Sequence, residues 1–266
     1  MTALTTLEAP VATREAHRSI PMSRILGVEL RKMFDTRSGF WLLVSVGVFA
    51  TLATVAVILV APRDELTYET FATAIGFPMA VILPMIAILS VTSEWSQRTG
   101  LTTFTLVPSR GRVIAAKWLD TVAIGVVSML VAGAVGAVGN VVGTAIAGVD
   151  TSWNVSLPEY AMIILANVLG MMVGFTLGVL FRNSAAAIVG YFVFSLLLPA
   201  VSGALAASQA WFRDARPWVD WNYAQSALFN GVPSSEQWAH LGVASLIWLG
   251  IPLAIGLWLV LRSEVK

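Results

Sequence analysis

Residues 40–61 read FWLLVSVGVFATLATVAVILVA and contain no charged side chain. A helix needs about 20 apolar residues to cross the hydrocarbon core of a bilayer, so this run is long enough to span it. The alternation typical of barrel strands is absent, which favours helices. The sequence therefore predicts an all-α polytopic membrane protein with six spans, at residues 40–61, 71–93, 118–147, 160–181, 185–207 and 241–261.

The composition excludes several classes of protein. Hydrophobic residues make up 57% of the 266 residues and charged residues only 12%. Soluble domains carry about 25% charged residues, so an ordinary soluble enzyme is excluded. The net charge of +1 gives no reason to expect nucleic acid as a partner. The chain has no cysteine, which rules out disulfides and thiolate metal sites.

The distribution of Lys and Arg predicts the orientation. If the N-terminus is placed inside, only Arg63, Arg213 and Arg216 of the 16 basic residues fall on the outer side. Basic residues are concentrated on the cytoplasmic side of membrane proteins. We therefore expect both termini to be cytoplasmic, with residues 1–20 as a disordered tail and residues 21–266 as a single membrane domain.

An amphipathic segment precedes the first span. Residues 21–38 place apolar side chains on one side of a helical wheel and basic ones opposite, which is typical of a helix lying at the membrane interface. Glu29 lies near the apolar side and weakens the pattern. Two interpretations stay open: a positive anchor that sets topology, which the sequence slightly favours, or an elbow helix that packs against the spans and moves with them. The apolar side of this elbow consists of Leu26, Leu30, Met33 and Phe34.

The inside segment between the second and third spans is the only long one. Residues 94–117 read EWSQRTGLTTFTLVPSRGRVIAAK. Glu94 and Arg98 have the spacing of a helical ion pair, Pro108 would end a short helix, and Ser109 could cap the next one. An ion pair of this kind contributes only about 0.2–0.5 kcal/mol. Docking onto a cytoplasmic partner is therefore a better explanation of this segment than stability.

The same segment carries a family resemblance. Its Glu-Trp-x-x-x-Thr pattern, followed by Pro-Ser-Arg and by a Lys entering the third span, resembles bacterial ABC-2 type transporter permeases. The end of the chain is similar to actinobacterial members of that family. The matching residues are Glu94, Trp95, Thr99, Pro108, Ser109, Arg110 and Lys117, and near the end Trp248, Pro252, Leu253, Gly256, Arg262 and Glu264-Val265-Lys266.

The resemblance implies the transmembrane subunit of a bacterial ABC exporter, with a type V exporter-like fold in the plasma membrane. Permeases of this family form dimers, here expected to be a homodimer, and associate with two copies of a separate ATPase. The sequence contains no G-x-x-x-x-G-K-[ST] motif, so we expect no ATPase site and no cofactor on this chain, with ATP and Mg on the partner. The resemblance places the ATPase-coupling role on Glu94, Trp95, Arg98, Thr99, Pro108, Ser109, Arg110 and Lys117.

Small residues and prolines recur within the spans. The fourth span has glycines at every fourth position, which lets another helix approach closely. Packing within the chain is the favoured interpretation, and a dimer interface is the alternative. Prolines in the second, fifth and sixth spans should kink their helices unless neighbours satisfy the freed carbonyls. The residues are Gly170, Gly174 and Gly178 for packing, and Pro78, Pro84, Pro199 and Pro252 for kinks.

Three polar residues within or near the spans are candidates for a specific role. Asn140 and Asn167 are expected to make helix-to-helix hydrogen bonds, with a substrate contact as the alternative. Asp120 follows Lys117 by three residues, so a local ion pair would explain it. No H-E-x-x-H motif or carboxylate pair occurs within a span, which disfavours an intramembrane enzyme.

The function expected from all of this is ATP-driven export by a transport subunit. The spans supply no fixed charges for a polar solute, which favours an amphipathic or hydrophobic cargo such as a drug, an antimicrobial peptide or a lipid-linked compound. An ATP-independent carrier or a structural membrane subunit is the alternative, and dependence on an ATPase separates the two.

Overall fold

The computed structural model describes residues 20–96 and 109–262. Among these residues every regular element is a helix, apart from one isolated bridge between Thr67 and Ser152. The elements are α1 (Met22–Asp35), α2 (Arg37–Val60), η1 (Arg63–Glu65), α3 (Tyr68–Ser96), α5 (Arg110–Ala147), α6 (Leu157–Phe181), α7 (Ser184–Phe192), η2 (Val193–Leu197), α8 (Leu198–Ser208), α9 (Ala210–Val219), α10 (Trp221–Ser226), η3 (Ala227–Phe229), α11 (Ser235–Ser245), η4 (Leu246–Gly250) and α12 (Ile251–Arg262).

Six helical stretches are long and apolar enough to cross a membrane. They are α2, α3, α5, α6, the continuous stretch Ser184–Ser208 and the continuous stretch Ser235–Arg262. The prediction of an all-α, multi-pass membrane protein with six spans is confirmed. The main difference is that α5 begins at Arg110, well before the predicted start of the third span at residue 118.

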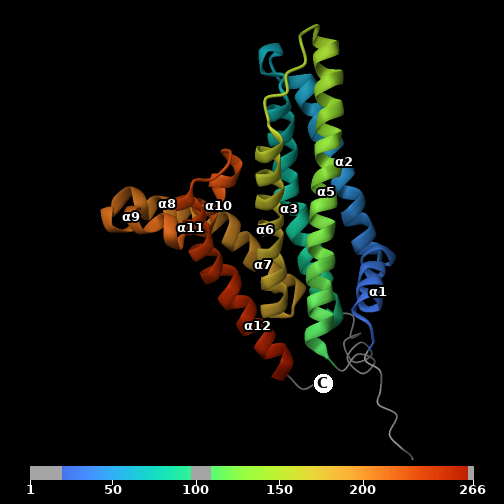
Figure 1. The fold of residues 1–266 in the computed structure, drawn as a ribbon, viewed down its shortest axis with the longest axis vertical. Coiled ribbons are helices and arrows are strands. Elements are labelled where there is room, and N and C mark those ends of the chain that lie inside the picture. The colour runs from blue at the N-terminus through green and yellow to red at the C-terminus, as the bar shows by residue number, and fades with distance from the viewer. Residues whose placement is uncertain (1–19, 97–108, 263–266) are drawn as a thin grey trace, which may run out of the picture.

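The second span, α3, forms the centre of the bundle. It packs against α2, α5 and α6, and Figure 1 shows these helices running side by side along the long axis. Pro84 lies within α3 and has no N–H to bond the carbonyl of Ala80. The hydroxyl of Tyr191, from α7, donates to that carbonyl at 2.7 Å. A neighbouring helix thus satisfies the acceptor that this proline frees.

The glycines of α6 allow its close approach to α3. A Cβ atom at Gly174 would lie 2.7 Å from the carbonyl oxygen of Pro84, and one at Gly178 would lie 3.4 Å from that of Ile88. Gly170 instead faces the side chain of Gln225 in α10. Gly174 and Gly178 therefore serve packing within one chain.

The last two spans differ from the others in shape and burial. Each contains a π-helical turn, η2 and η4, followed by a proline, Pro199 or Pro252. The two turns pack together through Phe194 and Trp248, whose ring centroids are 5.3 Å apart. Figure 1 shows α8, α9 and α11 projecting to one side of the bundle. Only 17% of the most apolar 18-residue stretch of each of these two spans is buried, against 61% in α6. Lipid or another chain must therefore cover the rest.

Candidate functional site

Helix α1 packs one narrow face against the bundle. Its buried residues are Ile25, Glu29 and Met33, which recur every four positions. Of the predicted apolar side of the elbow, Met33 is buried and Leu26 is half-buried, whereas Leu30 and Phe34 are exposed. The apolar side chains of α1 therefore divide between the bundle and the surroundings, and a carboxylate lies in the middle of the bundle-facing side.

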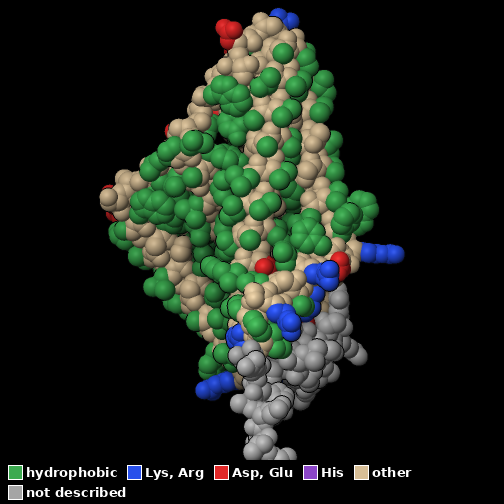
Figure 2. All heavy atoms as spheres, turned by 45° about the vertical axis from the view of Figure 1, so that its right-hand side comes forward, with side chains coloured by type: hydrophobic (Ala, Val, Ile, Leu, Met, Phe, Trp, Pro, Cys, Tyr) green, Lys and Arg blue, Asp and Glu red, His purple; other side chains and the backbone are tan. Residues whose placement is uncertain are grey.

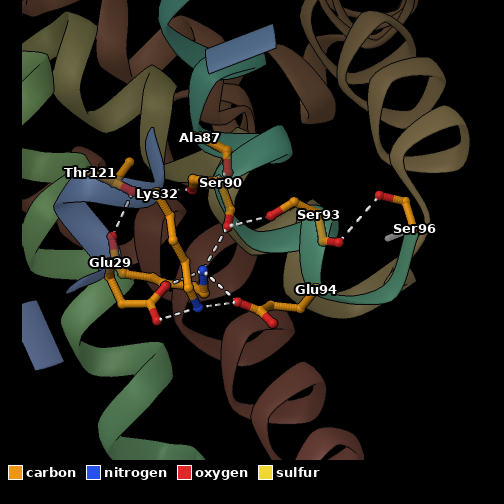
Figure 3. Close-up of polar contacts among 9 residues, drawn as sticks. Glu29, Lys32, Ala87, Ser90, Ser93, Glu94, Ser96 and Thr121 are labelled. Carbon is orange, nitrogen blue, oxygen red and sulfur yellow. Dashed lines mark hydrogen bonds and ion pairs between the residues drawn. The ribbon is translucent and has the colours of Figure 1, made fainter. Parts of the chain in front are cut away.

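Four charged residues from three helices meet at this face (Figure 3). We call Glu29 and Lys32 of α1, Glu94 of α3 and Lys117 of α5 the elbow cluster. Lys32 Nζ lies 2.8 Å from Glu29 Oε1 and 3.0 Å from Glu94 Oε1. Lys117 Nζ lies 2.5 Å from Glu29 Oε2 and 3.2 Å from Glu94 Oε1. Each carboxylate contacts both ammonium groups, so the cluster is a closed network.

The elbow cluster is largely removed from solvent. The side chains of Glu29 and Glu94 are 3% exposed and that of Lys117 is 6% exposed, whereas Lys32 is 38% exposed. Burial lowers the pKa of Lys32, but hydrogen bonds and charges from Glu29 and Glu94 outweigh it and place that pKa above its ordinary value. Breaking such a buried pair by removing one partner costs about 3–5 kcal/mol, because the other charge stays buried alone.

The backbone of α3 and the start of α5 complete the surroundings. Lys117 Nζ donates to the carbonyl of Ser90 at 3.0 Å, and Thr121 Oγ1 donates to the carbonyl of Lys117 at 2.6 Å. Asp120 is buried, and its Oδ2 has no hydrogen-bond partner among the described residues. Within that part of the chain Lys117 forms ion pairs with Glu29 and Glu94 only. The predicted local ion pair between Lys117 and Asp120 is therefore wrong.

Several predicted coupling residues flank residues 97–108, which lie outside the described part of the chain. Trp95 is partly buried against the core, next to Glu94. Ser109 takes the N-cap position of α5, but its side chain makes no capping hydrogen bond. Arg110 donates to the carbonyl of Val260 in α12 at 3.0 Å. The remaining three predicted residues, Arg98, Thr99 and Pro108, fall within 97–108.

The intramembrane amides lie away from the elbow cluster. Asn140 is fully buried and donates to the carbonyl of Ser152, in the connection between α5 and α6, at 2.8 Å. Asn167 donates to the carbonyl of Ile163 within its own helix, at 2.9 Å. The hydrogen bond of Asn140 thus goes to a connecting segment and that of Asn167 to its own helix. The sequence had instead predicted hydrogen bonds to a neighbouring span.

Sequence reasoning missed Glu29 and Lys32 as members of the site. The available signal was Glu29 itself, a carboxylate in register with Ile25 and Met33 on the apolar side of an amphipathic helix. A charge at such a position needs a partner of opposite sign. Among residues 20–96 and 109–262, no group of three or more His, Asp or Glu side chains could hold a metal ion.

Comparison with protein-family models and with curated proteins finds no match to this chain.

Proposed function

We propose that this chain is the membrane-spanning permease subunit of an ABC exporter driven by a separate ATPase. The observation that carries the proposal is the elbow cluster, in which Glu29, Glu94 and Lys117 join α1 to the end of α3 and the start of α5. These two helix ends flank residues 97–108, the segment to which the ABC-2 resemblance gives the coupling role. A site that joins the elbow to both flanks of that segment is suited to transmit a mechanical input.

The cluster makes the three helices move as one unit. An ATPase that pushes on residues 97–108 acts on the ends of both α3 and α5, because the segment connects them. Separating α1, α3 and α5 would leave charges buried without partners, which is costly. Moving them together keeps every ion pair intact. The input is thus directed into rigid-body motion of the spans, the kind of motion that alternating access requires.

The cargo proposed is amphipathic or hydrophobic. A cavity of about 610 Å³ opens between α3, α6 and the segment after η3. Phe77, Ile163 and Phe229 give it an apolar wall, and Glu69 and Glu159 give it a polar edge. Its size falls in the range of small-molecule sites, roughly 300–1,000 Å³. Apolar and polar lining together support a cargo with both kinds of surface.

The proposed assembly is a homodimer of this chain with two ATPase copies that carry ATP and Mg. It would lie in a bacterial plasma membrane with both termini cytoplasmic. Most Lys and Arg side chains visible in Figure 2 lie toward the end of the molecule that holds α1, which supports this orientation. The poorly buried faces of α2 and of the last two spans leave area for lipid and for a second copy.

Purification from native membranes in mild detergent, followed by mass spectrometry, tests the proposal first. We expect a soluble ATPase in a one-to-one ratio with this chain. If the chain is isolated alone under conditions that preserve other membrane complexes, an ATP-independent carrier or structural subunit takes the place of the exporter.

A substitution in the elbow cluster tests the coupling role. Glu94→Gln keeps the shape of the side chain and removes its charge. We expect the complex to assemble and its ATP hydrolysis in vesicles to fall about tenfold, equivalent to about 1.4 kcal/mol in the barrier. Glu65→Gln, in the exposed η1 turn, is the matched control and should hydrolyse ATP at the normal rate. Equal rates in both variants would contradict the coupling role of Glu94.

A further inference from the structure

A second cavity lies beside the elbow cluster, between α1, α2 and α3. Its volume is about 200 Å³. Protein interiors have few voids larger than a water molecule, and about 10–15 Å³ of such volume is enough for one water. The cavity therefore has room for a group of many atoms. It is separate from the larger cavity between α3 and α6, with which it shares no lining residue.

The walls of this cavity are of two kinds. Part of the lining is charged or polar and includes Lys32, Ser93 and Glu94. Another part is apolar and includes Leu42, Ile86 and Leu89. The four charges of the elbow cluster all border the cavity and balance, two negative against two positive. A ligand that carries one positive and one negative charge on its polar part can contact the cluster without unbalancing it, and an apolar part next to them suits the apolar lining.

The surroundings of α1 indicate where such a ligand comes from. Leu30 and Phe34 of α1 are exposed apolar side chains, and Arg31 between them is an exposed cation. This combination is typical of a helix at the boundary between lipid headgroups and acyl chains. Residues of that same helix line the cavity, namely Glu29, Lys32 and Met33. A membrane phospholipid is thus the amphiphilic ligand that this position makes available.

We propose that the cavity between α1, α2 and α3 binds a phospholipid whose headgroup carries both a phosphate and a primary ammonium, as in phosphatidylethanolamine. The phosphate lies at Lys32, the most exposed charge of the cluster. The ammonium lies at Glu94 and Ser93, where it can donate hydrogen bonds. The beginning of an acyl chain packs on Leu42 and Leu89. A quaternary choline cannot donate these hydrogen bonds, and phosphatidylglycerol has no cation to offer.

Lipid retention measures this directly and does not depend on transport. The full chain is reconstituted in vesicles of equal parts phosphatidylethanolamine, phosphatidylglycerol and phosphatidylcholine, extracted in mild detergent and weighed by native mass spectrometry. We expect one retained phosphatidylethanolamine per chain. Leu89→Trp and Ser93→Phe, which fill the cavity, should each lower its retention about tenfold. Leu52→Trp, on the exposed side of α2, is the control and should retain the lipid.

Three outcomes would overturn the proposal: no retained lipid, equal retention of the three lipids, or equal retention by the filled variants and the control. Two filling variants are used so that one that fails to fold still leaves a test. These results are also separable from the exporter proposal. If the chain binds phosphatidylethanolamine but is isolated without an ATPase, the lipid-site proposal stands and the exporter proposal fails. If it is isolated with an ATPase but retains no phosphatidylethanolamine, the exporter proposal stands and the lipid-site proposal fails.

Chemical protection provides a second readout within the membrane. The chain has no cysteine, so Ser38→Cys places a single thiol at the cavity wall without removing a group assigned to the headgroup. We expect a water-soluble maleimide to label it about tenfold more slowly in phosphatidylethanolamine vesicles than in phosphatidylglycerol vesicles. Equal labelling in both would contradict a site selective for phosphatidylethanolamine.

Discussion

The elbow cluster and the Arg216–Asp220 pair are both ion-pair sites with buried carboxylates, but they connect different parts of the chain. The elbow cluster joins residues of α1, α3 and α5 that are far apart in the sequence. Arg216 and Asp220 are four residues apart, at the end of α9, with Arg216 Nε 3.1 Å from Asp220 Oδ2. Asp220 also accepts hydrogen bonds from Ser202 and from the backbone of Tyr223. The ion pairs of the first site fix three helices against one another. In the second site the ion pair stays at the end of α9, and hydrogen bonds with the neutral hydroxyl of Ser202 reach another helix, α8.

The two sites differ in how sensitive they are to the loss of one charged partner. Removing Arg216 leaves Asp220 with two other donors, so the turn keeps much of its bonding. Removing Lys117 leaves Glu29 and Glu94 with Lys32 as their only ion-pair partner among the described residues. A long-range buried network is therefore sensitive to each member, whereas a local pair backed by neutral hydrogen bonds is not.

Replacing Lys117 should have the largest effect on stability. Lys117→Met keeps the length of the side chain and removes its charge, which leaves an excess of buried negative charge. We expect the free energy of unfolding to fall by about 3–5 kcal/mol. Unfolding in mixed micelles with increasing SDS, followed by the fluorescence of the ten tryptophans, provides the measurement. A loss below about 1 kcal/mol, the range of exposed pairs, would show that the cluster is accessible to water.

A double-mutant cycle should show that the cluster acts as a network. Glu29→Gln and Lys117→Met are made singly and together, and the same unfolding assay is applied to all four chains. Because the two groups are in contact, we expect a coupling free energy of about 1–3 kcal/mol. The pair Glu65→Gln and Lys117→Met is the control and should be additive, since Glu65 lies in the exposed η1 turn. If the effects of Glu29→Gln and Lys117→Met were additive, the elbow cluster would not act as a network, and its contrast with the local Arg216–Asp220 pair would be lost.

The fold was predictable from the sequence because length and hydrophobicity decide which helices can span a bilayer. The long charge-free runs required helices in lipid, where every backbone polar group must be bonded internally. The glycine spacing of α6 also indicated close packing, which Gly174 makes against Pro84. What the spacing could not identify was the partner helix, because many spans could approach a glycine face. The start of α5 at Arg110 agrees with Ser109 as its N-cap, whereas the predicted span began only at residue 118 because a helix that continues beyond the membrane carries no apolar signal there.

The elbow cluster was only half predictable. Glu94 and Lys117 were identified from the family pattern, but their partners lie on α1. A helical wheel shows which residues of α1 share a face and does not show which face meets the bundle. Leu30 and Phe34 have the same apolar character as Met33, yet only Met33 is buried. Local ion pairs were favoured because sequence shows only near neighbours, and this is why Lys117 was assigned to Asp120.

Replacing Arg216 should have the smallest effect and so sharpens the contrast. Arg216→Met removes the ion pair with Asp220 and the contact of the guanidinium with the ring of Tyr223, 4.6 Å from its centroid. Asp220 keeps the hydroxyl of Ser202 and the N–H of Tyr223, so no buried carboxylate loses all its donors. We expect a loss of about 1 kcal/mol in the SDS unfolding assay. Asp220→Asn, which retains an acceptor for the Tyr223 N–H, should cost a similar amount. A loss as large as that of Lys117→Met would mean that burial alone, and not the long-range network, sets the cost of breaking an ion pair in this protein.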